Sequence, residues 1–523
     1  FKRSAFFILH PTHSFLAIHP PVLYIYFKLT INLDDDQEVS MSPLDNLEPK
    51  LLWKHFDAIR QIPRPSGDET AAAEYVISVA KKLGCDYEKD ETGNVIVRKS
   101  ASPGHENAKT VVLQSHLDMV CEKDSDKEFN FDTDAIQLVR DGEWLKADGT
   151  TLGADNGIGI AATLAIFEDD TLVHGPLEGL FTVDEERGLN GAMSVSNEWL
   201  KGRTMINLDS EELGVFSIGC AGGRDTNFTM HVHRTAPKGD KALEIRLYGL
   251  RGGHSGIDIH EYRGNALKIL NRLLYQVHKV IPLELACFHG GDKHNAIPRE
   301  AFAHVVIDSA KLNDFKSWFD KAISDVQTEF KPLEKNIAIS IKEIEKTKHD
   351  VLATESQNKL FALLFALPHG PLTMSRTIEN LVETSNNVAA LKCETEAIKI
   401  LTSSRSSNMK ALEATMDKLV AIGGLVDAVV EQPPGYPGWM PNLDSEVLQV
   451  SLDAYKQVTG EEAQYEAIHA GLECGLIGEK FPGMDMISVG PTLKHPHSPD
   501  ERVHIESVNV FYKHVLKMLE ILA

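Results

Sequence analysis

The sequence predicts an α/β domain that is split by an inserted α+β domain. Between residues 111 and 208, short apolar runs alternate with helical patterns, which is typical of a sheet flanked by helices. After the glycine cluster at 219–223 the pattern changes, and 243–249 alternates like a strand with one face in water. An apolar strand at 486–489 and a closing helix at 508–522 resume the first style. We therefore expect the first domain at 41–222 and 409–523 and the insertion at 223–408.

Local signals place the elements of the first domain. Apolar residues recur at helical spacing from 51 to 59, before prolines at 63 and 65 break the pattern. A second helix over 72–83 should stop at Gly84, because glycine readily takes the left-handed conformation that ends helices. The other expected elements are strands at 111–115, 180–183 and 205–208 and a helix at 158–167.

The insertion has a different order of elements. After the strand at 243–249 we expect a helix, a strand, a second helix and two strands, ending near residue 407. A helix over 409–422 should then lead back to the first domain.

Residues 1–40 differ from the rest of the chain. Lys2 and Arg3 precede an apolar stretch, as in a signal peptide, but prolines and histidines interrupt that stretch and no small-residue cleavage site follows. The stretch also lacks the roughly 20 uninterrupted apolar residues of a membrane span. We interpret these residues as a non-native or disordered extension and Met41 as the natural start.

The overall charge excludes several classes of partner. The chain has 53 Lys and Arg against 76 Asp and Glu, a formal net charge of -23. Nucleic acids and anionic membranes need a basic face, so neither is an expected partner. The six cysteines are scattered without a C-x-x-C pair, which favours a reducing compartment, and we expect a cytoplasmic protein.

Acidic residues and histidines follow several of the predicted core elements. His116 and Asp118 follow the strand at 111–115 on the same side of an extended chain, although a surface H-x-D would look the same. Asp155 lies in a glycine-rich loop before a helix, where a simple N-cap is the alternative. Glu185 and Glu186 follow the strand at 180–183; they could be a solvated acidic turn, or one could ligate a metal while the other accepts a proton.

Two further segments complete the set. Asp209 follows the strand at 205–208, and His497 follows the strand at 486–489. Nitrogen and oxygen donors without a thiolate suit zinc, manganese or cobalt, and Asp155 is the natural bridge of a two-metal centre. No H-E-x-x-H is present, and the G-x-G-x-x-A at 157–162 is a weak dinucleotide signal because a loop precedes it instead of a strand.

Longer segments carry a family resemblance from about Leu51 to the C-terminus. TLGADNGIG, DEE, GGHSG, NAIPRE, AIHAGLECG and HSPDERV resemble, in order and spacing, the metallopeptidase family that includes carboxypeptidase G, aminoacylase, peptidase T and carnosinase, most closely its bacterial dipeptidases. The resemblance implies a mixed-sheet catalytic domain for two metal ions, with the insertion as a lid and dimerisation domain. It also implies a cis peptide between Asp155 and Asn156, and a homodimer.

The resemblance also assigns roles to single residues. His116 and Asp209 would bind one ion, Glu186 and His497 the other, and Asp155 both. Asp118 would orient His116, and Glu185 would be the general base for a metal-bridging water. Five residues would serve the substrate. His254 in the lid would act at the oxyanion, either in its own subunit or in the partner, and the binding residues would be Arg405, Asn295, Glu473 and His469.

The implied function is hydrolysis of unsubstituted dipeptides, including Xaa-His dipeptides such as carnosine. The implied cofactors are two divalent ions, most simply Zn²⁺, with Mn²⁺ or Co²⁺ as alternatives. An aminoacylase or carboxypeptidase of the same fold is the alternative enzyme, and an inactive metal-binding assembly protein is the alternative outside enzymes. The acceptance of N-acetylated substrates separates the first alternative from a dipeptidase.

Overall fold

The computed structural model describes residues 42–523, so the predicted extension at 1–40 lies outside the described residues. Within this part of the chain, every helix is too short or too polar to cross a lipid bilayer.

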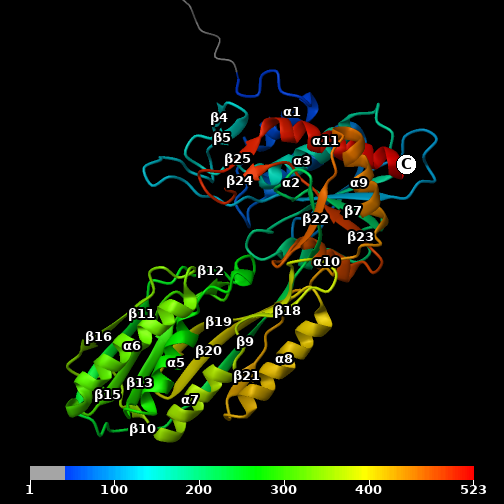
Figure 1. Cartoon of the computed structure of the whole chain (residues 1–523). Helices are drawn as coiled ribbons and strands as arrows, with labels where there is room; N and C mark the ends of the chain where they lie inside the picture. The colour runs from blue at the N-terminus through cyan, green and yellow to red at the C-terminus, as the bar shows by residue number, and fades with distance from the viewer. Residues whose placement is uncertain (1–41) are drawn as a thin grey trace, which may run out of the picture. The chain divides into compact units, whose positions relative to one another are not determined.

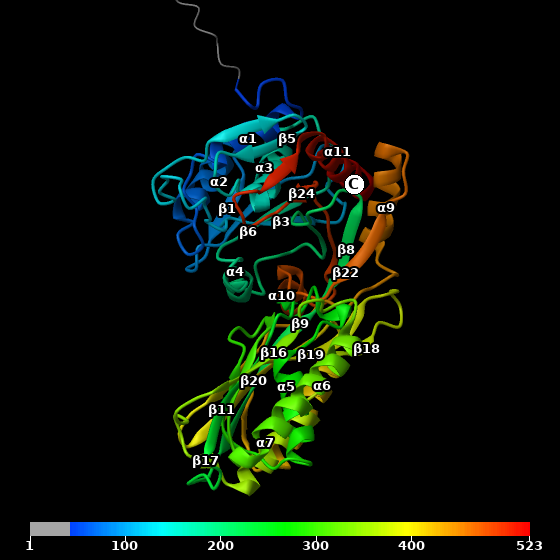
Figure 2. The same ribbon diagram turned by 60° about the vertical axis from the view of Figure 1, so that its left-hand side comes forward.

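An eight-stranded mixed sheet forms the first domain. Its strand order is β1-β2-β6-β3-β7-β23-β8-β22, with the parallel pair β8 and β22 at one edge (Figure 2). Helices cover both faces. The bounds of the strands are β1 Asp86–Lys89, β2 Val95–Lys99, β3 Val111–His116, β6 Leu177–Thr182, β7 Thr204–Asn207, β8 Val215–Cys220, β22 Gln464–Ile468 and β23 Asp485–Ser488.

Alternate residues of the central strands pack into two different hydrophobic cores, one on each face of the sheet. In β3, Val111 and Leu113 join the larger core, whereas Val112 joins the smaller one on the opposite face. This double burial explains why apolar residues follow one another in these strands instead of alternating with polar ones. The helices of the larger core are α1 Lys50–Ile59, α2 Thr70–Leu83, α3 Ala154–Glu168, α9 Glu446–Thr459 and α11 Ile505–Leu522, and those of the smaller core are α4 Asn190–Ser194 and α10 Glu473–Lys480.

The expected elements of this domain are confirmed. The predicted helix at 72–83 is α2, and it ends at Gly84 in the left-handed conformation (φ 70°). A small sheet with the order β24-β25-β5-β4 lies beside the main one, with bounds β4 Leu138–Asp141, β5 Trp144–Ala147, β24 Leu493–Lys494 and β25 Arg502–His504.

A nine-stranded antiparallel sheet forms the inserted domain (Figure 1). Its strand order is β16-β11-β15-β13-β19-β20-β9-β21, and β18 pairs with β19. The burial of β11 alternates as predicted. The bounds are β9 Gly222–His231, β11 Lys241–Tyr248, β13 Glu284–Gly290, β15 Ala301–Ile307, β16 Ala338–Glu343, β18 Gly370–Met374, β19 Val382–Cys393, β20 Ala397–Ser406 and β21 Val429–Glu431.

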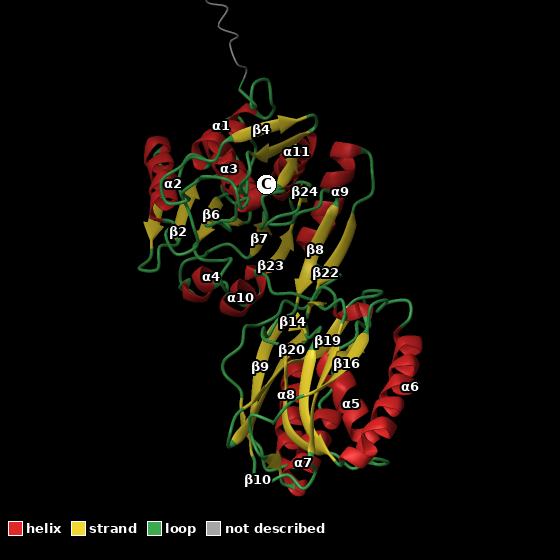
Figure 3. Ribbon diagram, turned by 90° about the vertical axis from the view of Figure 1, so that its left-hand side faces the viewer, coloured by secondary structure: helices red, strands yellow, loops and turns green. Residues whose placement is uncertain are grey.

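Four helices pack along one face of this sheet (Figure 3). The expected succession of elements undercounted the strands, because it contained four strands whereas the sheet has nine. The helices are α5 Ala266–His278, α6 Leu312–Phe330, α7 Thr354–Ala366 and α8 Met409–Gly424. Two short pairs complete the domain: β10 Arg234–Thr235 with β17 Val351–Leu352, and β12 Gly253–His254 with β14 Ala296–Ile297.

The expected boundary at residue 409 is wrong in position. Helix α8 packs on β20 and β9, and its Leu419 belongs to the core of the inserted sheet. Strand β21 then extends the same sheet beside β9. The chain therefore leaves the inserted domain after Glu431, because the apolar face of α8 is buried there.

Candidate metal centre

Three neighbouring parallel strands bring polar residues to one edge of the main sheet. Strand β3 lies between β6 and β7 and is parallel to both. His116 is the last residue of β3, Glu185 and Glu186 follow β6, and Asp209 follows β7. Ligands gather at the carboxyl ends of such strands, and this topology turns four distant residues into neighbours.

The Asp155 carboxylate lies between two histidines. Its Oδ1 is 3.0 Å from His116 Nε2, and its Oδ2 is 3.1 Å from His497 Nε2. On the outer sides, His116 Nε2 is 3.3 Å from Asp209 Oδ1, and His497 Nε2 is 3.1 Å from Glu186 Oε2. The structure thus brings together all five side chains that the sequence predicted as metal ligands. They form two overlapping groups that share Asp155, and in each group the ligand atoms lie within 4.8 Å of one another.

The chemistry of this cluster fits divalent cations. The His116 Nδ1 faces Asp118 and donates to its main-chain oxygen at 3.1 Å, so the Nε2 of the neutral ring carries a lone pair. Burial opposes protonation of His116, but the facing carboxylates of Asp209 and Asp155 raise its pKa well above the usual range. A bound cation would take the place of the proton on Nε2. Glu186 Oε1 is likewise buried without a hydrogen-bond partner.

The local electrostatics also favour added positive charge. Burial raises the pKa of Glu185 well above its usual range; His116 opposes this shift, while the negative charges of Asp209, Glu473 and Glu186 increase it. Burial likewise raises the pKa of Asp209 to about 6. Two divalent ions would offset this concentration of carboxylates.

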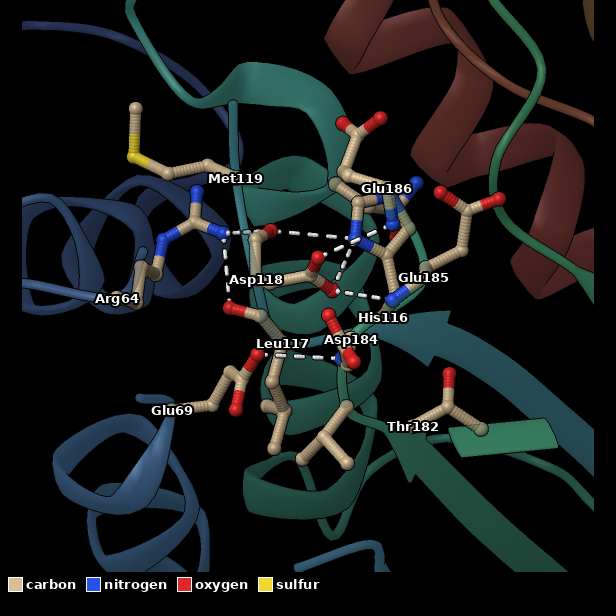
Figure 4. Close-up of polar contacts among 12 residues, drawn as sticks. Arg64, Glu69, His116, Leu117, Asp118, Met119, Thr182, Asp184, Glu185 and Glu186 are labelled. Carbon is tan, nitrogen blue, oxygen red and sulfur yellow. Dashed lines mark hydrogen bonds and ion pairs between the residues drawn. The ribbon is translucent and has the colours of Figure 1, made fainter. Parts of the chain in front are cut away.

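The Asp118 carboxylate binds main-chain and side-chain groups of the candidate metal centre. Its Oδ1 accepts the Glu185 N–H at 3.0 Å, and its Oδ2 accepts the Glu186 N–H at 3.1 Å (Figure 4). The same carboxylate lies 3.3 Å from His116 Nδ1. Burial opposes ionisation, but the hydrogen bonds from His116 and from the main chain hold the Asp118 pKa below its usual range. One buried side chain therefore orients an imidazole and the turn that carries both glutamates.

Two supporting residues escaped sequence reasoning. The fully buried Arg64 donates to the main-chain oxygens of Leu117, Asp118 and Gly153, which ties the two loops of the centre together. Glu501 accepts four main-chain N–H groups, those of residues 152–155, at 2.7–3.3 Å. The motif HSPDERV contained Glu501, but only the fold shows that it binds the start of α3.

The start of α3 is unusual in two ways. The peptide between Asp155 and Asn156 is cis, as the family resemblance implied. Asn156 donates to the Leu208 main-chain oxygen at 2.8 Å and to Asp209 at 2.5 Å. A Cβ on Gly159 would lie 2.1 Å from Asn156 Oδ1 and 2.9 Å from the Leu208 oxygen. This glycine therefore permits close packing, which accounts for the G-x-G-x-x-A pattern without a dinucleotide.

A cleft of about 700 Å³ opens beside the centre. Asp209 and His469 both line it. His469 Nε2 is 2.7 Å from Ser385 Oγ, and burial lowers the His469 pKa to about 3. Glu473 is buried and does not line this cleft. Its carboxylate accepts hydrogen bonds from Gln114 at 2.6 Å and from Thr182 at 2.7 Å.

His254 lies in the inserted domain with a defined tautomer. Its Nδ1 accepts the N–H groups of Gly256 at 3.2 Å and Ile257 at 3.1 Å, so the neutral ring carries its proton on Nε2. Burial lowers the His254 pKa, and the charge of Arg405 lowers it further. The ring is therefore a neutral N–H donor at physiological pH.

The other predicted substrate residues also belong to the insertion. Arg405 lies in β20, is 5 % exposed, and donates to Tyr436 Oη at 2.7 Å while its Nε has no partner. Asn295 is exposed, and its main-chain oxygen accepts the Ser255 N–H at 2.7 Å. Within residues 42–523, no hydrogen bond or ion pair joins His254, Arg405 or Asn295 to the five predicted ligands. Their roles stay predictions.

Comparison with known proteins gives consistent matches over most of the chain. A profile of the peptidase family M20/M25/M40 matches residues 112–521. The cytosol non-specific dipeptidase of Escherichia coli (strain K12) is 42% identical over 481 residues, which is 92% of this chain and 99% of that protein. The crystal structure of aminoacylhistidine dipeptidase from Vibrio alginolyticus has 42% identity and a TM-score of 0.86, covering 92% of this chain and 98% of that one.

A more distant structure shares the fold. The aminopeptidase PepT from Bacillus cereus ATCC 10987 has 16% identity and a TM-score of 0.54, covering 91% of this chain and 99% of that one. The matches confirm the family resemblance drawn from the motifs and the split catalytic domain. From the profile match and from the identity along nearly the whole chain, we conclude that the protein belongs to the peptidase family M20/M25/M40 and hydrolyses peptide bonds.

Proposed function

We propose that the protein hydrolyses unsubstituted dipeptides with the help of two divalent metal ions. The observation that carries the proposal is the Asp155 carboxylate, which presents one oxygen to His116 at 3.0 Å and the other to His497 at 3.1 Å. A carboxylate shared in this way is what a bridged pair of ions requires. The names of the two relatives at 42% identity support dipeptides as substrates, including those with a C-terminal histidine, such as carnosine.

The five clustered side chains would hold the ions. His116 and Asp209 would bind one ion, Glu186 and His497 the second, and Asp155 both. We propose zinc, because a nitrogen and oxygen donor set in a catalytic site suits it. When bound, the ions supply a Lewis acid for the scissile carbonyl and make a water molecule acidic enough to attack it.

Glu185 is the proposed general base. It is held beside His116 by the bond from its own N–H to Asp118 at 3.0 Å. Its carboxylate accepts the proton of the attacking water and then delivers that proton to the leaving amine. Burial raises the pKa of Glu185, and the negative charges of the neighbouring carboxylates raise it further, which makes Glu185 a stronger base.

Residues of the inserted domain complete the proposal. The Nε2–H of His254 would stabilise the oxyanion, because Nδ1 is already occupied by main-chain N–H groups. Arg405 would bind the substrate carboxylate, for which a guanidinium has the matching fork geometry. Asn295, His469 and Glu473 would help bind the dipeptide. Because no hydrogen bond or ion pair among the described residues 42–523 joins His254 to the cluster, we propose that it acts across a homodimer formed by the inserted domain.

A substrate panel tests the proposal. Purified protein loaded with Zn²⁺ should release free amino acids from carnosine, Ala-His and Gly-Gly but not from their N-acetylated forms, and a chelator should stop the release. Glu185→Gln should lose at least 100-fold in kcat and keep its metal, whereas the matched Glu198→Gln should match the parent, because Glu198 is exposed. Cleavage of N-acetylated substrates at equal rates would instead indicate an aminoacylase. We further propose that the enzyme works in the cytoplasm, as the name of the E. coli relative suggests.

A further inference from the structure

Two cysteines meet in the inserted sheet, and neither has a role in the proposed dipeptide hydrolysis. Cys287 lies in β13, and Cys393 is the last residue of β19. The two strands pair at Gly290 and Leu391, which brings the cysteines to neighbouring positions. Cys393 Sγ lies 3.8 Å from the main-chain oxygen of Ala286, next to Cys287, and interaction with the Cys393 thiol raises the pKa of Cys287.

Arg234 sits against this pair. Its Nη2 is 3.5 Å from Cys393 Sγ, and its Nη1 donates to the Ala286 oxygen at 2.7 Å. Further bonds to the main-chain oxygens of Asp350, Glu394 and Thr395 hold the guanidinium in place. A fixed cation beside a sulfur favours the thiolate form.

The two cysteines differ in access and in ionisation. Cys287 is 8% exposed, whereas Cys393 is partly exposed. The hydrogen bond from Cys287 lowers the pKa of Cys393 to about 6; burial opposes this shift, and Arg234 supports it. The more accessible sulfur is therefore the nucleophile, and the buried thiol behind it is placed to react second.

We propose that Cys393 and Cys287 form an oxidant-accepting dithiol site that reduces hydroperoxides and closes to a disulfide. The Cys393 thiolate attacks the terminal oxygen of the hydroperoxide, the O–O bond breaks, and a sulfenic acid forms. The leaving alkoxide, or the hydroxide that leaves from hydrogen peroxide, takes a proton from solvent to become an alcohol or water. The Cys287 sulfur then attacks the Cys393 sulfur and the S–O bond breaks. The hydroxide of the sulfenic acid leaves as water with the Cys287 proton. Two thiols are oxidised to one disulfide, and one peroxide is reduced.

Alkylation of the full-length, zinc-loaded protein tests the nucleophile. At pH 7, iodoacetamide should label Cys393 about 10-fold faster than Cys85, since the higher thiolate fraction outweighs the lower intrinsic nucleophilicity of a low-pKa thiol. Cys85 is a matched internal control because it is also partly exposed, and burial raises its pKa. Equal rates at the two positions would overturn the assignment. Arg234→Gln should slow labelling of Cys393 but not of Cys85; an unchanged Cys393 rate would remove Arg234 from the proposal.

Oxidation tests the second step. Stoichiometric hydrogen peroxide should produce one Cys287–Cys393 disulfide in a peptide map made without reductant. Cys287→Ser should instead leave a sulfenic acid on Cys393 that dimedone traps, and Cys393→Ser should yield neither product. These two variants replace one sulfur by oxygen, so their thermal unfolding should match that of the reduced parent. A disulfide between other cysteines, or sulfenic acid on Cys393 without a disulfide in the parent, would overturn the proposal.

Discussion

Replacing Glu501 by glutamine should weaken both the stability of the first domain and its hold on metal. The two oxygens of Glu501 each accept two main-chain N–H groups: Oε2 accepts those of Leu152 and Gly153, and Oε1 those of Ala154 and Asp155. A glutamine keeps one oxygen for one pair and turns its own N–H toward the other pair. Two buried donors then lose their acceptor.

The size of the effect follows from those two donors. A buried donor left without a partner costs about 1–3 kcal/mol, so Glu501→Gln should lower the free energy of unfolding by about 2–6 kcal/mol. The loop that these bonds hold carries Asp155, so metal affinity should also fall, by about 10- to 100-fold. Urea unfolding followed by circular dichroism, with chelator present, measures the first effect without a contribution from metal. Titration with Zn²⁺ measures the second.

A matched substitution provides the control. Glu520→Gln makes the same chemical change at a side chain that is 55% exposed and paired with Lys517. Exposed pairs of this kind contribute about 0–1 kcal/mol, so this variant should resemble the parent in both assays. A loss below 1 kcal/mol for Glu501→Gln, or an equal loss in both variants, would refute the reasoning.

Three further predictions concern neighbouring parts of the first domain. Asp118→Asn should lower kcat about 10- to 100-fold in steady-state assays, because one of the two glutamate N–H groups loses its acceptor; an unchanged kcat would contradict this role. Gly159→Ala should lower the melting temperature by several degrees in calorimetry, since its Cβ would meet Asn156, whereas Gly424→Ala meets nothing within 4 Å and should not lower it. Burial lowers the pKa of His514 to about 4 in the folded protein. Below pH 6.5 this histidine is therefore protonated in the unfolded chain but stays neutral in the folded one, and the free energy of unfolding falls as the pH is lowered. Between pH 7.5 and 5.5 this loss is about 1 kcal/mol, and urea unfolding of His514→Gln should lack it.

Periodicity was sufficient for the four central strands of the first domain, β6, β3, β7 and β23, because they are buried on both faces. Runs such as 111–115 and 205–208 are mostly apolar and buried throughout, so they were visible without knowledge of their partners. The inserted sheet was harder to predict. Its strands pair with distant segments, and the polar interior of β19 and the packing of α8 follow from those pairings instead of from local pattern.

Residue types and motif order determined the set of predicted ligands, because catalytic metals demand nitrogen and oxygen donors that few other sites group in this way. The tertiary structure decided which of those donors meet. The parallel order β6-β3-β7 places His116, Glu186 and Asp209 together, and the turn between β24 and β25 adds His497. Glu501 and Arg64 became recognisable only then, because their partners are main-chain groups, and a sequence does not show where main-chain N–H and C=O groups point in a folded chain.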